Sequence, residues 1–254
     1  MTLSVVLITE NEEANLARTL ASVDPLVRDG RGEIIVVDSG SSDATLAIAR
    51  SFGAKIFSEP WKGFAAQKNS AMAKATCDWV LQLDADEALE PELAKEILEG
   101  ALTSDPDVAG FWIPRKNFFL GRWIRHGGFY PDRKLRLLRR GAGWFQEYGA
   151  HPTIEVRGAT GKLHHALLHH AYPTLRGYLD HMNRYSSCQA ELAVAQGYRG
   201  FRLLKIVLRP LLTFVYNYGF RLGFLDGREG LLLHLYHATY VSWKYAKAWQ
   251  LGRS

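Results

Sequence analysis

An apolar segment that ends in three carboxylates is the part of this sequence best suited to chemistry. Residues 79–87 read WVLQLDADE, so a strand-like run leads directly into Asp84, Asp86 and Glu87. In α/β proteins, ligands bind beyond the carboxyl ends of parallel strands. Carboxylates placed there can hold a divalent cation, and Mg²⁺ usually takes one or two of them together with substrate phosphates. The alternative interpretation is a charged turn after a strand.

Two earlier segments have the same design. Residues 3–8 (LSVVLI) and 33–37 (EIIVV) are short β-branched runs, which are typical of strands buried on both faces. The first run leads into Thr9 and the second into Asp38. We therefore expect Thr9, Asp38 and Asp84 to meet at one edge of a sheet.

Helices are expected between these strands. Asn11 can cap a first helix, and further helices are predicted over residues 44–51 and 64–75, with a weaker strand at 54–57. Strands and helices that alternate at this spacing predict an α/β fold with a mostly parallel sheet.

The sequence contains no glycine-rich phosphate loop. Neither G-x-G-x-x-G nor G-x-x-x-x-G-K-[ST] occurs, which counts against a dinucleotide enzyme and against a phosphate-loop ATPase. The remaining possibility is a nucleotide held partly by carboxylates and partly through a metal on its phosphates.

These segments resemble family 2 glycosyltransferases of the GT-A fold. The resemblance rests on residues 3–12 (LSVVLITENE), 34–43 (IIVVDSGSSD) and 79–87. Other stretches resemble the lipopolysaccharide core β-1,4-glucosyltransferase branch of that family: GFAAQKN at 63–69, NFFLGRWIRHGGFYPDRKLRLLRR at 117–140, HPTIEVRG at 151–158 and RPLLTFVYNYGFRLGFLDGREGL at 209–231.

The resemblance implies a nucleotide-sugar donor and a divalent metal, Mg²⁺ or Mn²⁺. Asp38 would contact the base or ribose, with Thr9 and Glu12 lining the same pocket. Asp86 would bind the metal directly, and Asp84 would reach the ribose or, through water, the metal. Lys68 either reaches the pocket or the diphosphate, or is a solvated helix charge.

An inverting transferase needs a carboxylate within hydrogen-bond reach of the acceptor hydroxyl. In the related enzymes an Asp or Glu lies four positions before a His, and here Glu147 precedes His151 by four. Glu147 is expected in a glycine-flanked loop and is our first candidate for the base. Asp132 is the second. Many relatives have His-Glu where this chain has His151-Pro152, so any role of that Glu is in doubt here.

The middle of the chain is basic and aromatic. Residues 111–140 carry nine Lys and Arg and one acid, Asp132. Together they fit a phosphorylated glycolipid acceptor, although any one arginine is more simply a solvated surface charge. The histidines at 164, 165, 169 and 170 match no recognised tetrahedral metal set. One of His169 or His170 could still add a metal ligand or a diphosphate contact.

The carboxy-terminal segment, residues 199–254, carries nine Lys and Arg and two acids among large apolar residues. Its longest uninterrupted apolar stretch, 230–243, is shorter than the roughly 20 residues that span a bilayer. Pro210 is expected to break or restart a helix. Basic amphipathic helices of this kind lie in the headgroup plane of an anionic membrane. The alternative is packing on the catalytic domain or homodimerisation.

We therefore expect a glycosyltransferase domain over 1–198, with a donor half (1–110) and an acceptor half (111–198), followed by the helical segment 199–254. Residues 1–110 hold 9 Lys and Arg against 19 acids, and residues 111–254 hold 22 against 7. This asymmetry suggests an anionic partner for the second half. No nucleic-acid-binding signature occurs, so a membrane is favoured over nucleic acid.

Two cysteines in 254 residues give no disulfide framework, which favours a reduced compartment. With a core strand at its start and no signal peptide, the protein is expected to be cytoplasmic and peripheral on the inner face of the cytoplasmic membrane. One alternative is a polyprenyl-phosphate glycosyltransferase, whose relatives usually span the membrane. The other is a non-catalytic membrane-binding protein on the same fold.

Overall fold

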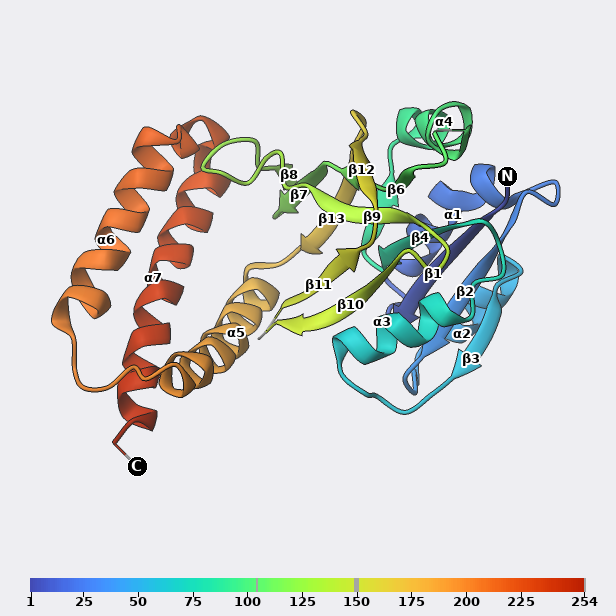
Figure 1. Ribbon diagram of the computed structural model, residues 1–254. Coiled ribbons are helices and arrows are strands. Elements are labelled where there is room, and N and C mark those ends of the chain that lie inside the picture. The colour runs from blue at the N-terminus through green and yellow to red at the C-terminus, as the bar shows by residue number, and fades with distance from the viewer. Residues whose placement is uncertain (104, 149–150, 254) are drawn as a thin grey trace. The chain divides into compact units, whose positions relative to one another are not determined.

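The computed structural model describes residues 1–103, 105–148 and 151–253 and divides the chain into two compact units (Figure 1). Unit 1 comprises residues 1–115, 133–147 and 152–169, and unit 2 comprises residues 116–132, 148–151 and 170–254. This division groups residues 170–198 with the carboxy-terminal helices, whereas the sequence suggested a boundary after residue 198.

Unit 1 is built on a seven-stranded sheet with the order β12-β6-β9-β4-β1-β2-β3. The bounds of its strands are β1 (Leu3–Thr9), β2 (Gly32–Asp38), β3 (Lys55–Ser58), β4 (Trp79–Asp84), β6 (Val108–Ile113), β9 (Lys134–Arg139) and β12 (Ala159–Lys162). The pairs β1/β2, β1/β4, β2/β3 and β6/β12 are parallel, and β9 runs antiparallel to β4 and β6. The α/β fold with a mostly parallel sheet is thereby confirmed.

Helices cover both faces of this sheet. The helices of unit 1 are α1 (Leu16–Val27), α2 (Thr45–Ser51), α3 (Phe64–Ala73), α4 (Pro91–Glu99) and the short η1 (Ala101–Thr103). Side chains from α1, α2 and α4 share one core with alternate residues of β1, β2 and β4, and α3 packs against the other face through Ala71 (Figure 1). The β-branched strands are buried on both faces, as their composition predicts.

Outside the large sheet, the chain forms three smaller strand pairs. β10 (Gly143–Tyr148) and β11 (His151–Val156) form a two-stranded sheet. In unit 1, β5 (Glu87–Leu89) pairs antiparallel with the first half of β13 (Leu167–Tyr172). In unit 2, the end of β7 (Arg115–Phe119) pairs antiparallel with β8 (Arg122–Trp123).

Two local expectations from the sequence were wrong. Asn11 does not cap the first helix, because α1 starts only at Leu16. Asn11 instead has a φ of 56° and accepts a hydrogen bond from the Ser42 amide at 2.9 Å. Glu147 lies in strand β10 rather than in a loop.

Unit 2 is mainly helical. Its elements are α5 (Leu175–Ala195), the π-helical stretch η2 (Leu204–Leu208), α6 (Arg209–Phe214), a second π-helical stretch η3 (Val215–Phe220), η4 (Gly223–Asp226) and α7 (Gly227–Leu251). Helices α5 and α7 pack together around Tyr178, Met182 and Leu233. Pro210 lies where the helix restarts: η2 ends at Leu208 and α6 begins at Arg209, with Pro210 in its first turn, where its missing N–H is tolerated. Among the described helices, none is both long and apolar enough to cross a membrane.

Candidate functional site

The carboxyl ends of three neighbouring strands meet at one edge of the unit 1 sheet. In the register of the parallel pairs, Thr9 lies opposite Asp38 and Ile8 lies opposite Asp84. The Thr9 hydroxyl donates a 2.9 Å hydrogen bond to Asp38 Oδ2. The predicted convergence of Thr9, Asp38 and Asp84 is therefore observed.

Asp38 organises the loop that follows β2. It is 1% exposed, and its Oδ1 accepts the amides of Gly40 and Ser41 at 3.0 and 2.9 Å. Its Oδ2 accepts the Thr9 and Ser41 hydroxyls at 2.9 and 2.5 Å. Burial alone would raise the pKa of Asp38, but these four hydrogen bonds lower it below its usual range. A carboxylate has about four acceptor sites, and on Asp38 the four hydrogen bonds that shape this loop occupy them.

Glu12 lies close to the carboxylates after β4. Burial raises the pKa of Glu12, a hydrogen bond from Asn15 opposes that rise, and the nearby charges of Asp86, Asp43 and Asp84 add to it. Its carboxyl group is therefore easier to protonate than an ordinary glutamate. Glu12 thus lies within electrostatic range of Asp84 and Asp86. Its predicted place beside Asp38 and Thr9 in the donor pocket stays a prediction.

Asp84 is held by a cation on each oxygen. Lys68 Nζ lies 2.5 Å from Oδ1, and Arg136 Nη2 lies 2.6 Å from Oδ2. Burial would raise the pKa of Asp84, but Arg136 and Lys68 hold it well below its usual range. Burial also lowers the pKa of Lys68 by more than Asp84 raises it. Lys68 is therefore part of a buried ion pair and is not a solvated helix charge.

Arg136 is a central residue of this site that the sequence analysis missed. Its buried guanidinium also donates to Glu87 Oε1 at 2.8 Å and to Gln82 Oε1, and Arg115 donates to the same Glu87 oxygen at 2.9 Å. Burial would lower the pKa of Arg136, but Asp84 and Glu87 raise it. Arg115 and Arg136 thus pair with carboxylates of their own unit and are not surface charges. A basic residue at a buried position of the strand KLRLLR was the signal available in the sequence.

Asp86 has different surroundings. Its Oδ2 lies 3.4 Å from Nε2 of His169, and both side chains are partly exposed. Burial would raise the pKa of Asp86, but the hydrogen bond and the charge of His169 lower it. His169 is one of the two histidines that the sequence marked as possible ligands.

The pair Asp86 and His169 fits a divalent cation. Neighbouring ligands of an octahedral ion with bonds of about 2.1 Å lie about 3 Å apart, which is close to the observed separation. Asp84 is less suited to direct coordination, because both of its oxygens already face cations. In the described part of the chain no three His, Cys, Asp or Glu side chains form a metal-binding group.

Three consecutive residues of α3 connect the parts of this site. Gln67 donates to the Ser39 hydroxyl at 3.1 Å, next to Asp38, and Lys68 pairs with Asp84. Asn69 donates to the Phe145 carbonyl at 2.8 Å and accepts the Phe145 amide at 2.7 Å. The first turns of α3 thereby tie the β2 loop, the end of β4 and strand β10 to one element.

The two candidate bases lie in different units. Glu147 follows Phe145 by two residues in β10, and its side chain lies outside the described part of the structure. Asp132 belongs to unit 2, where its Oδ2 accepts a 3.2 Å hydrogen bond from Asn117. The choice between them stays a prediction.

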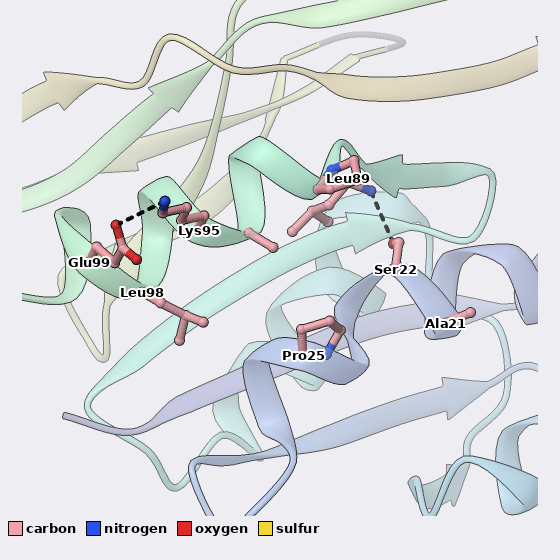
Figure 2. A pocket seen from close by; sticks show the side chains of 9 residues that line it. Ala21, Ser22, Pro25, Leu89, Lys95, Leu98 and Glu99 are labelled. Atoms are coloured by element: carbon pink, nitrogen blue, oxygen red, sulfur yellow. Dashed lines mark hydrogen bonds and ion pairs between the residues drawn. The ribbon is translucent and has the colours of Figure 1, made fainter.

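A groove elsewhere in unit 1 is unrelated to these residues. It has a volume of about 350 Å³ and lies between α1 and α4, with Leu89 and Leu98 in its largely apolar lining (Figure 2). Figure 2 shows the hydrogen bond that the Leu89 amide donates to the Ser22 hydroxyl, 3.0 Å long, and the ion pair between Lys95 and Glu99. None of the predicted donor or metal residues lines this groove, so we assign it no part in the chemistry.

The architecture is that of the GT-A fold. A mannosyltransferase from Pyrobaculum calidifontis, solved with GDP-Man and Mn²⁺, aligns with a TM-score of 0.57 at 16% identity, covering 97% of this chain and 86% of that one. Glucosyl-3-phosphoglycerate synthase from Mycobacterium tuberculosis, solved with Mn²⁺, UDP and phosphoglyceric acid, aligns with a TM-score of 0.51 at 21% identity, covering 77% and 78%. These likenesses establish the fold.

The chain belongs to glycosyl transferase family 2, whose sequence profile matches residues 4–160. It is 30% identical over 98% of its length to the lipopolysaccharide core biosynthesis glycosyltransferase LpsC of Rhizobium meliloti (strain 1021), of which it covers 92%. It is also 33% identical to a dolichyl-phosphate hexose transferase of Haloferax volcanii, over 38% of this chain and 42% of that protein. The resemblance seen in the sequence is confirmed at the level of the family.

Proposed function

We propose that this protein is an inverting glycosyltransferase that moves a sugar from a nucleotide-sugar donor to a lipid-linked glycan acceptor of the lipopolysaccharide core type. The observation that carries the proposal is the edge where Asp38, Asp84 and Asp86 meet. Asp84 is fixed by Lys68 and Arg136, while Asp86 and His169 face each other as a pair of potential ligands.

The donor half is organised before any substrate binds. Thr9, Glu12 and the loop shaped by Asp38 would hold the base and ribose, and Gln67 supports this loop through Ser39. The buried ion pairs fix Asp84 and Glu87, so little reorganisation is needed when the donor arrives. Preorganised charges of this kind account for much of the rate enhancement in many enzymes.

Asp86 and His169 would hold Mg²⁺ or Mn²⁺, with Asp84 beside them at the ribose or in contact with the metal through water. When bound, this ion offsets the negative charge that develops on the leaving diphosphate. The Lys68 ammonium group forms an ion pair with Asp84 at the same edge and adds positive charge there. A carboxylate, with Glu147 ranked before Asp132, would take the proton of the acceptor hydroxyl as it attacks the anomeric carbon.

A lipid-linked acceptor fits the charge of the second half of the chain. Residues 111–254 carry 22 Lys and Arg against 7 acids, which suits a phosphorylated glycolipid in an anionic membrane. The similarity to LpsC supports a lipopolysaccharide core acceptor. We therefore place the protein at the inner face of the cytoplasmic membrane as a peripheral enzyme, with a homodimer as the competing explanation of its carboxy-terminal helices.

A thermal-shift panel of nucleotide sugars tests the donor assignment. A ligand at 100 times its Kd stabilises the folded state by about 2.7 kcal/mol. For a chain of this size that corresponds to a rise in Tm of roughly 5–10 °C. We expect one nucleotide sugar to produce this rise with Mg²⁺ or Mn²⁺, and a smaller one in chelator. No response to any nucleotide sugar would contradict the proposal.

A polyprenyl-phosphate acceptor is the second candidate. It is favoured by the similarity of 97 residues to the dolichyl-phosphate hexose transferase of Haloferax volcanii. The two candidates share a donor site and differ in product. Mass spectrometry of the lipid product separates a sugar on a polyprenyl phosphate from a sugar on a core glycolipid.

A further inference from the structure

Unit 2 exposes a continuous row of large apolar side chains along the helical run 204–220. We call it the apolar stripe, and its eight members are 42–78% exposed: Leu204, Val207, Leu208, Leu211, Leu212, Val215, Tyr216 and Phe220. Members recur every three or four residues, so they lie on one face of the run. The exposed Arg209 lies between its members Leu208 and Leu211. Exposed Phe201, Leu222, Phe224 and Leu225 extend the apolar surface at its ends.

The opposite face of this run packs on α7. The Ser242 hydroxyl donates to the Ile206 carbonyl at 2.8 Å, and Arg209 donates to the Tyr245 hydroxyl at 2.7 Å. Pro210 is buried, and Ile206 packs against the cluster around Tyr245. The run is therefore fixed to its own unit through its inner face, and the apolar stripe is left facing outward.

Helix α7 has a different role from the run 204–220. It contributes Leu233, Tyr245 and Ala248 to the buried clusters of unit 2. It exposes only scattered large apolar side chains, such as Leu231 at 40% and Leu235 at 45%. Isolated exposed residues are normal on a protein surface, whereas a contiguous apolar patch marks an interaction site.

The charges around the stripe select its partner. Residues 192–225 carry five Lys and Arg and no Asp or Glu. Arg202, Lys205 and Arg209 lie over the rings of Tyr198 and Tyr245, and Arg221 lies over Tyr216 of the stripe. A symmetric dimer through this face would bring basic residues against the same basic residues. Anionic lipid headgroups complement this charge, and acyl chains complement the stripe.

We propose that the apolar stripe inserts into the headgroup–acyl boundary of an anionic bilayer while α7 supports the run from behind. The run then lies in the plane of the membrane, as basic amphipathic helices with large apolar residues do. This inference deepens the proposed lipid-linked acceptor by naming the residues that contact the lipid. It does not depend on the identity of the donor or of the base.

Vesicle co-sedimentation of the full-length protein tests the inference without any substrate. The stripe variant is Leu208→Ser/Leu211→Ser/Leu212→Ser, and the matched control on α7 is Leu231→Ser/Leu235→Ser. We expect wild type and control to bind phosphatidylglycerol-containing vesicles, less so as salt rises. The stripe variant should bind about a hundredfold more weakly, because three inserted apolar side chains are lost.

Three results would overturn the inference. They are no binding of the wild type to anionic vesicles, equal binding by the stripe variant, and a wild-type dimer that the stripe variant dissociates without a change in vesicle binding. Circular dichroism checks that each variant is folded. Donor hydrolysis in detergent separates this inference from the proposed function: it should be equal in wild type and stripe variant. If neither wild type nor the stripe variant hydrolyses the donor, but the stripe variant still binds vesicles more weakly than wild type, only the proposed function fails.

Discussion

Asp84 and Asp86 are two positions apart, yet their surroundings give them different tasks. Asp84 has a cation on each oxygen, and its low pKa keeps it ionised throughout the physiological range. Asp86 instead faces His169, with Oδ2 3.4 Å from Nε2. We therefore propose that Asp86 and His169 bind the metal and that Asp84 positions the donor.

The first prediction concerns the base. Glu147→Gln keeps the size of the side chain and removes its basicity, so donor affinity should persist while kcat falls by about 10² to 10⁴. Single-turnover assays and donor titration measure the two effects separately. If Glu147→Gln transfers sugar like wild type and Asp132→Asn is inactive, the base is Asp132.

The second prediction concerns Asn69, which bonds both backbone groups of Phe145, two residues before Glu147. Asn69→Ala should free strand β10 and lower kcat by about tenfold to a hundredfold, because small misplacements of catalytic groups have effects of that size. The KM for the donor should change little. The matched control is Gln67→Ala, which should raise the KM for the donor because Gln67 supports the loop of Asp38. An unchanged kcat in Asn69→Ala would remove this positioning role.

At the scale of elements, the sequence predicted the alternation of strands and helices but not the ion pairs that join them. The β-branched residues of the buried strands predicted where each strand ends. Thr9, Asp38 and Asp84 follow those ends, so they could be placed at one edge of the sheet. The partner of Asp84 on β9 lies 52 residues away in the chain, and nothing local indicates that pairing. Asn11 misled because asparagine is favoured both as a helix cap and in the left-handed conformation, and here it has a φ of 56° five residues before α1.

The helical unit contains a buried histidine that should make it sensitive to acid. His234 is 1% exposed, and neither ring nitrogen has a hydrogen-bond partner among the described residues. Burial, with a smaller effect of His237, lowers the pKa of His234 to about 4, although Asp226 opposes this. The unfolded chain therefore binds the proton more readily, so stability is full above about pH 6.5 and falls as the pH drops toward 4.

The third prediction follows from this histidine. His234→Phe cannot be protonated, so its urea midpoint should fall less than that of wild type between pH 7.5 and 5, the range in which folded His234 stays neutral. The exposed His165→Phe serves as the control and should behave like wild type. Equal losses in all three proteins would show that His234 does not govern the acid response.

At the scale of the whole molecule, charge and apolar surface are divided between the two halves of the chain. The acidic first half supplies the carboxylates of the candidate site, and the basic second half supplies Arg136 and His169 and carries the helices with the exposed stripe. The sequence indicated a membrane-binding tail over 199–254, but it could not separate the supporting helix α7 from the outward-facing run. Both are rich in large apolar residues, and the packing of α7 on α5 distinguishes them. Removal of residues 199–254 would take away that support, so point variants are the better probes.

The most direct test of the central claim is sugar transfer by Asp86→Ala, compared with wild type in Mg²⁺, in Mn²⁺ and in excess chelator. We expect wild type to transfer sugar only when a divalent ion is present. We expect Asp86→Ala to be folded by circular dichroism and inactive under all three conditions, since the main protein ligand for the ion is gone. Full activity of wild type in chelator, or of Asp86→Ala in Mg²⁺ or Mn²⁺, would contradict the account.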